Sequence, residues 1–194
     1  MNNEIEIKVI IDNPTEVETI LLTFAKSKSE CSRQTDIYYI MPNCNFFKEI
    51  PVTRYLRLRI NENRKASFDY HLCHLNNDGH LLFTSEFETE ISDPTAMIEI
   101  CNKIGLVKYV EVIKNRKEFL VENFKITIDK IESLGTFMEI EYSNIFDGNE
   151  NKVDSIKKQC FELLEKCGAK WTPAPKLGYP DMILAQKLEL NSSI

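Results

Sequence analysis

Near its start the chain reads Glu4-Ile5-Glu6-Ile7-Lys8-Val9, and this stretch is the key to the fold. Charged and apolar side chains alternate there with a period of two, which is typical of a β-strand that has one charged and one apolar face. The same alternation recurs along most of the chain. It predicts eight strands, at residues 4–11, 34–41, 54–61, 66–73, 81–92, 111–120, 124–131 and 136–142.

Helical patterns fill some of the gaps between these strands. Asn13 is a candidate N-cap, and Pro14 suits the first turn of the helix that follows it. The predicted helices are residues 14–29, the segment from Asp93-Pro94 to near Gly105, residues 150–167 and a short helix from Pro180. Short turns between the later strands favour an antiparallel sheet that is large enough to close. We therefore expect an α+β fold, a closed eight-stranded antiparallel β-barrel with helices packed on the outside, in one domain over residues 1–194.

The composition is that of a folded, soluble chain. Of 194 residues, 43% are hydrophobic and 28% are charged, a composition that argues against an intrinsically disordered protein. The net charge of −6 argues against non-specific binding to nucleic acid or to an anionic membrane. No signal peptide or membrane-length apolar run is visible, so a cytoplasmic protein is expected. The six cysteines form no CxxC pair, and they are interpreted as small core residues rather than as a disulfide set.

The predicted strands gather their charges on one face. Alternate positions place these charged side chains opposite Ile, Leu, Phe and Met: Glu4, Glu6, Lys8, Arg57, Arg59, Glu86, Glu88, Glu90, Lys114, Arg116, Asp129, Glu139 and Glu141. The simplest alternative is a charged face that points at water, as in many one-sided sheets. However, the amphipathic helices need an apolar sheet surface to cover. If they pack outside a closed sheet, the charged face becomes the interior.

Charges held away from bulk water are costly unless they are paired or coordinated. Carboxylates in number are suitable ligands for magnesium or manganese. Clustered Arg and Lys suit phosphate oxygens, and an Arg can engage two of them at once. Acidic and basic groups together therefore favour a site for a complex of metal and polyphosphate.

Several motifs follow one another in a fixed order. They are Glu4-Ile5-Glu6-Ile7-Lys8, Gln34-Thr35-Asp36-Ile37-Tyr38-Tyr39, Leu56-Arg57-Leu58-Arg59, Glu86-Phe87-Glu88-Thr89-Glu90, Lys114-Asn115-Arg116, Ile128-Asp129-Lys130-Ile131, Leu134-Gly135-Thr136-Phe137-Met138-Glu139-Ile140-Glu141 and the tail Pro175-Lys176-Leu177-Gly178-Tyr179. This order resembles the CYTH superfamily, the triphosphate tunnel metalloenzymes, over nearly the whole chain. The second motif and the tail look most like the class IV adenylyl cyclase branch.

The resemblance implies a role for each group of charged residues. The metal-ligand candidates are Glu4, Glu6, Glu88, Asp129, Glu139 and Glu141, with Glu86 and Glu90 as weaker ones, and the implied cofactor is Mg²⁺ or Mn²⁺. The residues that would cradle the triphosphate and serve in catalysis are Lys8, Arg57, Arg59, Lys114 and Arg116. Metal ions at such a site neutralise phosphate charge and position the nucleophile.

The sequence departs from the family pattern at two places. Bacterial cyclases of this class carry a His-Phe signature upstream of the first motif, whereas only three residues precede Glu4 here. His71 stands where the family strand usually supplies a lysine, and an imidazole is neutral for much of the time at pH 7. Lys65 is a candidate substitute, so His71 and Lys65 both join the predicted substrate-binding residues.

Three kinds of function share this predicted site. A class IV cyclase would convert ATP to cyclic AMP and pyrophosphate, and a triphosphatase would hydrolyse thiamine triphosphate, inorganic tripolyphosphate or a nucleoside triphosphate. The third is a polyphosphate- or nucleotide-binding protein with little turnover. A messenger-RNA 5′-triphosphatase ranks last, because the acidic chain offers no nucleic-acid surface. The expected partner is a triphosphate small molecule, without nucleic acid or membrane, and a homodimer is an assembly that the sequence leaves open.

Overall fold

The computed structural model describes residues 2–49, 52–63, 65–175 and 178–192. Its strands are β1 (Asn2–Glu4), β2 (Glu6–Ile11), β3 (Ser27–Lys28), β4 (Ser32–Ile40), β5 (Arg54–Asn61), β6 (Ala66–Leu75), β7 (Leu81–Ile91), β8 (Val107–Val121), β9 (Phe124–Ile131), β10 (Gly135–Tyr142) and β11 (Trp171–Pro173). Its helices are α1 (Pro14–Leu21), α2 (Pro94–Lys103), α3 (Val153–Lys166) and α4 (Tyr179–Ser192), with the 3₁₀ turns η1 (Phe46–Lys48) and η2 (Glu150–Lys152).

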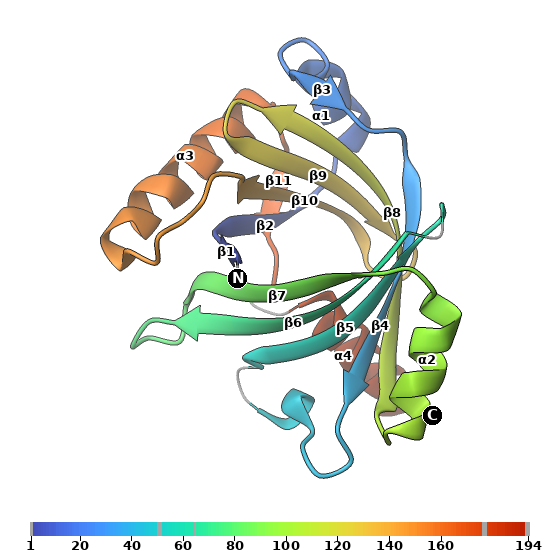
Figure 1. The fold of residues 1–194 in the computed structure, drawn as a ribbon. Helices are drawn as coiled ribbons and strands as arrows, with labels where there is room; N and C mark the ends of the chain where they lie inside the picture. Colours follow the sequence, from blue (N-terminus) through green and yellow to red (C-terminus); the bar gives the residue numbers. More distant parts are fainter. Residues whose placement is uncertain (1, 50–51, 64, 176–177, 193–194) are drawn as a thin grey trace.

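The strands form one strongly curled antiparallel sheet (Figure 1), so the predicted α+β class is confirmed, whereas closure of the sheet into a barrel stays a prediction. The order along the sheet is β1-β7-β6-β5-β4-β8-β9-β10-β2-β11, and β3 pairs with β8. The N-terminal segment contacts both ends of the series that runs from β7 to β10, because β1 pairs with β7 while β2 pairs with β10. The described residues form eleven strands rather than the eight predicted, since the first predicted strand is divided at Ile5 and two short strands were missed.

Two local predictions on the first helix were wrong. Helix α1 ends at Leu21, because the chain then turns so that β3 can pair with β8. The Asn13 side chain does not cap this helix, since its Nδ2 donates to the Gly168 carbonyl at 3.0 Å and to Glu16 at 2.7 Å. The second helix behaves as expected, with Asp93 Oδ1 accepting from the Ala96 amide at 3.0 Å.

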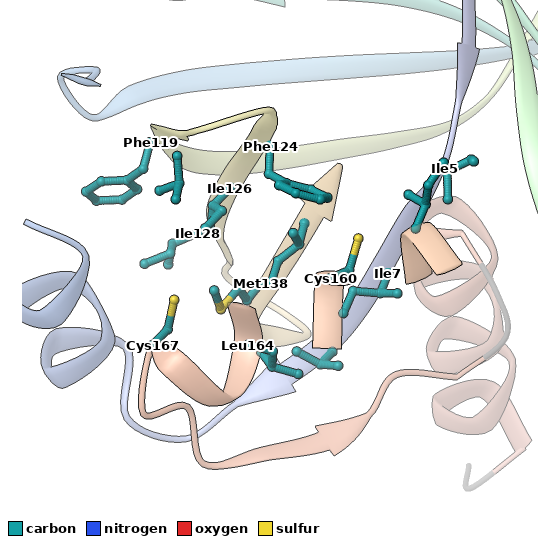
Figure 2. Close-up of a cluster of buried hydrophobic side chains, with 14 of the residues drawn as sticks. Ile5, Ile7, Phe119, Phe124, Ile126, Ile128, Met138, Cys160, Leu164 and Cys167 are labelled. Carbon is teal, nitrogen blue, oxygen red and sulfur yellow. The ribbon is translucent and has the colours of Figure 1, made fainter. Parts of the chain in front are cut away.

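The convex face of the sheet carries the largest apolar core. Figure 2 shows Cys160 and Leu164 of α3, with Cys167 directly after the helix, among isoleucines and Met138 of the neighbouring strands. Helix α1 adds Val17 and Leu21 to this core, and α2 covers a separate cluster on β4 and β5. All six cysteines are free, and three of them are buried as predicted, whereas Cys31 is exposed. None of the described helices is long and apolar enough to cross a membrane.

Helix α4 lies on the opposite, concave face, which corrects the prediction that the helices pack on the outside. Its Tyr179, Met182 and Ile183 pack against Tyr38 and Phe137, together with Val110, Val112 and Ile131. Tyr38 follows Asp36 by two positions and Phe137 precedes Glu139 by two. The charged face of the sheet therefore becomes apolar at one end, and α4 covers that end.

Candidate active site

Strand register places the predicted charges on the concave face. Residues directly opposite one another in an antiparallel pair point to the same side of the sheet. Arg57 of β5 lies opposite Asp69 of β6, and Arg59 lies opposite Asp36 of β4. In the other half of the sheet, and on the same face, Lys8 of β2 lies opposite Glu139 of β10 and Arg116 of β8 lies opposite Asp129 of β9.

These side chains form one continuous series of ion pairs, which we call the ionic belt. Its members in order are Glu86, His71, Asp69, Arg57, Asp36, Lys114, Asp129, Arg116, Glu139 and Lys8. Arg116 lies 2.6 Å from Glu139, His71 lies 2.8 Å from each of its two neighbours, and the longest link joins Arg57 to Asp36 at 3.9 Å. Arg59 joins the belt at its centre through Asp36. The belt links strands that lie far apart in the sequence.

Asp36 is the centre of the belt and was missed as a site residue. Its side chain is fully buried, and its two oxygens accept from Arg59 at 2.7 and 2.8 Å. Burial alone would raise the pKa of Asp36, but Arg59, Lys114 and Arg57 outweigh it and hold the pKa well below its usual range. The signal was present in the sequence, because Asp36 shares its strand face with Gln34 and Tyr38. Asp69 was missed in the same way.

The two predicted lysines of the belt have opposite environments. Burial and the nearby Arg116 lower the pKa of Lys114 to about 8, although Asp36 and Asp129 both lie 3.5 Å away. Burial also opposes the charge on Lys8, but Glu139 at 3.1 Å raises the pKa of that lysine above its ordinary value. Both ammonium groups are therefore held in place by carboxylates that phosphate oxygens could replace.

Tyr179 of α4 lies beneath both lysines and was not among the predicted site residues. Its ring centroid is 4.2 Å from the Lys8 ammonium nitrogen and 5.4 Å from that of Lys114. Its hydroxyl donates to Asp129 Oδ2 at 3.3 Å. These contacts make α4 part of the site as well as a cover for the apolar end. The tail motif gave a sequence signal here, although its Lys176 and Leu177 lie outside the described residues.

An acidic group lies beside the belt on β1, β2, β7 and β10. Burial, followed by Glu141 and Glu86, raises the pKa of Glu4 to about 9. Burial and Glu139 raise the pKa of Glu6 to about 7, while Lys8 opposes the shift. Both pKa values are raised first by burial and then by repulsion between the carboxylates, and a divalent cation would relieve that repulsion.

This donor set fits a hard divalent cation in its chemistry. Within the described part of the chain, however, no three acidic, His or Cys side chains already converge into a metal-binding group. Glu141 is paired with Lys125, a cation that the sequence reading did not single out although it shares a face with Asp129. Binding a metal here therefore requires the carboxylates to reorganise.

His71 lies between two carboxylates, which favour its protonated form. Its two ring nitrogens contact Asp69 and Glu86, each at 2.8 Å. Burial and Arg57 lower the pKa of His71, but hydrogen bonds to the two carboxylates outweigh them and raise it. The two carboxylates therefore favour the positive charge that a lysine would supply.

Other predicted residues are not brought into the belt. Lys65 is exposed in the turn between β5 and β6, where its carbonyl accepts from the Asn61 amide. Glu88 and Glu90 are exposed on β7, although Glu88 lies opposite Asp69 in register. Ligand roles for these two carboxylates stay predictions.

Comparisons with known proteins agree with this geometry. The CYTH domain model matches residues 2–171. A Methanocaldococcus jannaschii protein named "Putative adenylate cyclase" is 28% identical over 162 residues, covering 84% of this chain and 87% of that protein.

Solved structures share the fold. A Pyrococcus horikoshii OT3 protein superposes with a TM-score of 0.77 at 22% identity, covering 94% of this chain and 99% of that one. A Hippeastrum protein, described as an adenylyl cyclase candidate with a dominant triphosphatase activity, has a TM-score of 0.57 at 19% identity, over 88% of this chain and 90% of its own.

Proposed function

Because the chain belongs to the CYTH family, we propose that it is a divalent-metal-dependent enzyme that acts on a triphosphate inside its curled sheet. We place a class IV adenylate cyclase-like activity first and a triphosphatase second. The observation that carries the proposal is the ionic belt. Its basic side chains share one concave face and form ion pairs with carboxylates, which is the arrangement that a polyphosphate can take over.

In this proposal the sheet forms a closed tunnel whose bases grip the phosphate chain. Arg57 and Arg59 exchange their bonds to Asp36 and Asp69 for phosphate oxygens, with the guanidinium fork able to bind two oxygens at once. Lys8, Lys114 and Arg116 do the same from the opposite strands. Binding would cost little conformational entropy, because neighbouring strands already hold these donors in place.

Carboxylates freed by this exchange would then serve the cation. Glu4, Glu6 and Glu141 are the residues best placed to hold magnesium or manganese, with Asp129 and Glu139 adjoining. When bound, the metal supplies positive charge against the phosphate oxygens as negative charge moves onto the leaving group. His71 keeps Glu86 and Asp69 ionised, so the acidic side of the site stays in its metal-binding form.

The two activities differ in which phosphorus is attacked. In the cyclase the ribose 3′-oxygen attacks the α-phosphorus, its proton passes to solvent and pyrophosphate leaves. In the triphosphatase a water oxygen attacks the terminal phosphorus and orthophosphate leaves. The name of the M. jannaschii relative supports the first activity, whereas the activity described for the Hippeastrum protein supports the second.

A product assay tests the proposal. Purified protein with magnesium or manganese would be given ATP, thiamine triphosphate and tripolyphosphate in parallel, and cyclic AMP, pyrophosphate and orthophosphate would be resolved. Cyclic AMP with pyrophosphate supports the cyclase, and orthophosphate alone supports the triphosphatase. The double variant Glu4→Gln/Glu6→Gln should lose the product, whereas Glu99→Gln on exposed α2 should not. Binding without any product would leave only the non-catalytic alternative.

A further inference from the structure

Two buried oxygen atoms on the concave face have no hydrogen-bond partner among the described residues. They are Gln34 Oε1 and Asn61 Oδ1. Leaving a buried acceptor unsatisfied is costly, so folded proteins rarely keep two of them side by side without a use. Gln34 of β4 and Asn61 of β5 are direct cross-strand neighbours, and the Gln34 residue is only 7% exposed.

Their position borders the centre of the ionic belt. Gln34 precedes Asp36 by two residues and Asn61 follows Arg59 by two, so all four share one face of the sheet. Gln34 also lies opposite Lys114 in the register with β8. The amide pair is therefore one step along the strands from the cations that would hold phosphate.

The opposite direction along β4 is already filled. Tyr38, two residues beyond Asp36, packs in the apolar cluster that Tyr179 and Met182 of α4 complete. Tyr55 donates to Asp181 at 2.9 Å, and Asp181 accepts from the Gly178 amide at 3.0 Å, which fastens the start of α4 in place. An organic group joined to a phosphate chain at the belt would therefore extend toward the amide pair rather than toward α4.

We propose that Gln34 and Asn61 form a subsite for the organic part of the triphosphate, accepting hydrogen bonds from its hydroxyl or amino groups. This rests on the proposed function and narrows it to substrates that carry such donors, such as a nucleoside triphosphate. Inorganic tripolyphosphate lacks them. Both oxygens are covered in this structure, so nearby side chains shift as Arg59 and Lys114 turn toward phosphate.

The test compares one ligand with donors and one without. Dissociation constants for ATP and for tripolyphosphate would be measured by calorimetry with magnesium, on the wild type and on Gln34→Met. The subsite predicts that ATP affinity falls about tenfold or more while tripolyphosphate affinity stays within about twofold. Gln159→Met, on the exposed face of α3, is the matched control and should change neither.

Stability supplies an independent readout. Since the replaced acceptor is unsatisfied, Gln34→Met should leave the free energy of unfolding unchanged or raise it. Asn61→Leu repeats the test from the other strand if one variant folds poorly. Equal weakening of both ligands, or no weakening of ATP, would overturn the subsite while leaving the triphosphate site standing. A wild type that binds neither ligand would overturn both.

Discussion

Replacing Arg116 by Met is the most direct probe of the ionic belt. Arg116 is 6% exposed, and its guanidinium bonds Asp129 through Nε at 2.6 Å and Glu139 through a terminal nitrogen at 2.6 Å. Methionine keeps the apolar stem but removes the charge, which leaves two buried carboxylates with fewer partners. We expect a large loss of stability in the ligand-free protein.

The size of the loss follows from the contacts that remain. Breaking a buried ion pair typically costs about 3–5 kcal/mol. Asp129 keeps Lys114 at 3.5 Å and the Tyr179 hydroxyl at 3.3 Å, and Glu139 keeps Lys8 at 3.1 Å. Because each carboxylate retains a partner, we expect the free energy of unfolding to fall by about 3 kcal/mol, the lower end of this range. Urea unfolding at 25 °C and neutral pH would measure it.

The control is a more exposed pair of the same chemistry. Arg54 pairs with Glu49, and their side chains are 35% and 30% exposed. Arg54→Met should cost less than about 1 kcal/mol, since solvent screens the pair. Magnesium tripolyphosphate at a hundred times its Kd should add about 2.7 kcal/mol to the wild type and less to Arg116→Met. If the two substitutions cost the same, the belt is not held by buried ion pairs and the reasoning fails.

Further predictions concern pH and the helix beneath the lysines. In metal-free buffer the stability should fall as pH rises from 4.5 through about 9, because the folded pKa values of Glu4 (about 9) and Glu6 (about 7) lie above the unfolded value. Urea titrations across this range would show a flatter profile for Glu4→Gln/Glu6→Gln, and an unchanged slope would refute the assignment. Tyr179→Leu removes the ring beneath Lys8 and Lys114 and should weaken tripolyphosphate binding about tenfold, whereas Tyr179→Phe should weaken it less than about threefold. Equal affinity in all three proteins, measured by calorimetry, would make Tyr179 a packing residue only.

Strand alternation was sufficient to predict most of the sheet and its charged face. A side chain two positions from a predicted site residue lies on the same face, so Lys8 and Glu139 could be assigned without any tertiary information. The same rule covers Asp36, Asp69 and Lys125. Asp36 was treated only as part of a motif, and Asp69 and Lys125 were not assigned to the charged face.

Long-range contacts were beyond this reasoning. Whether His71 is charged depends on Asp69 and Glu86, and the latter lies on another strand. Helix α4 was predicted, but its place on the concave face depends on the apolar residues Tyr38 and Phe137, which single strands do not reveal. Register and tertiary packing, rather than local pattern, decided these features.

The balance of charge on the concave face explains why a metal belongs to the proposed site. Lys8, the arginines and Lys114 are each paired with a carboxylate, so the concave face offers little net positive charge to a polyphosphate. Phosphate that takes over the bases leaves those carboxylates buried and unpaired, which is costly. A divalent cation held by the same carboxylates removes that cost. Metal and triphosphate should therefore bind with positive cooperativity, each strengthening the other by the same factor.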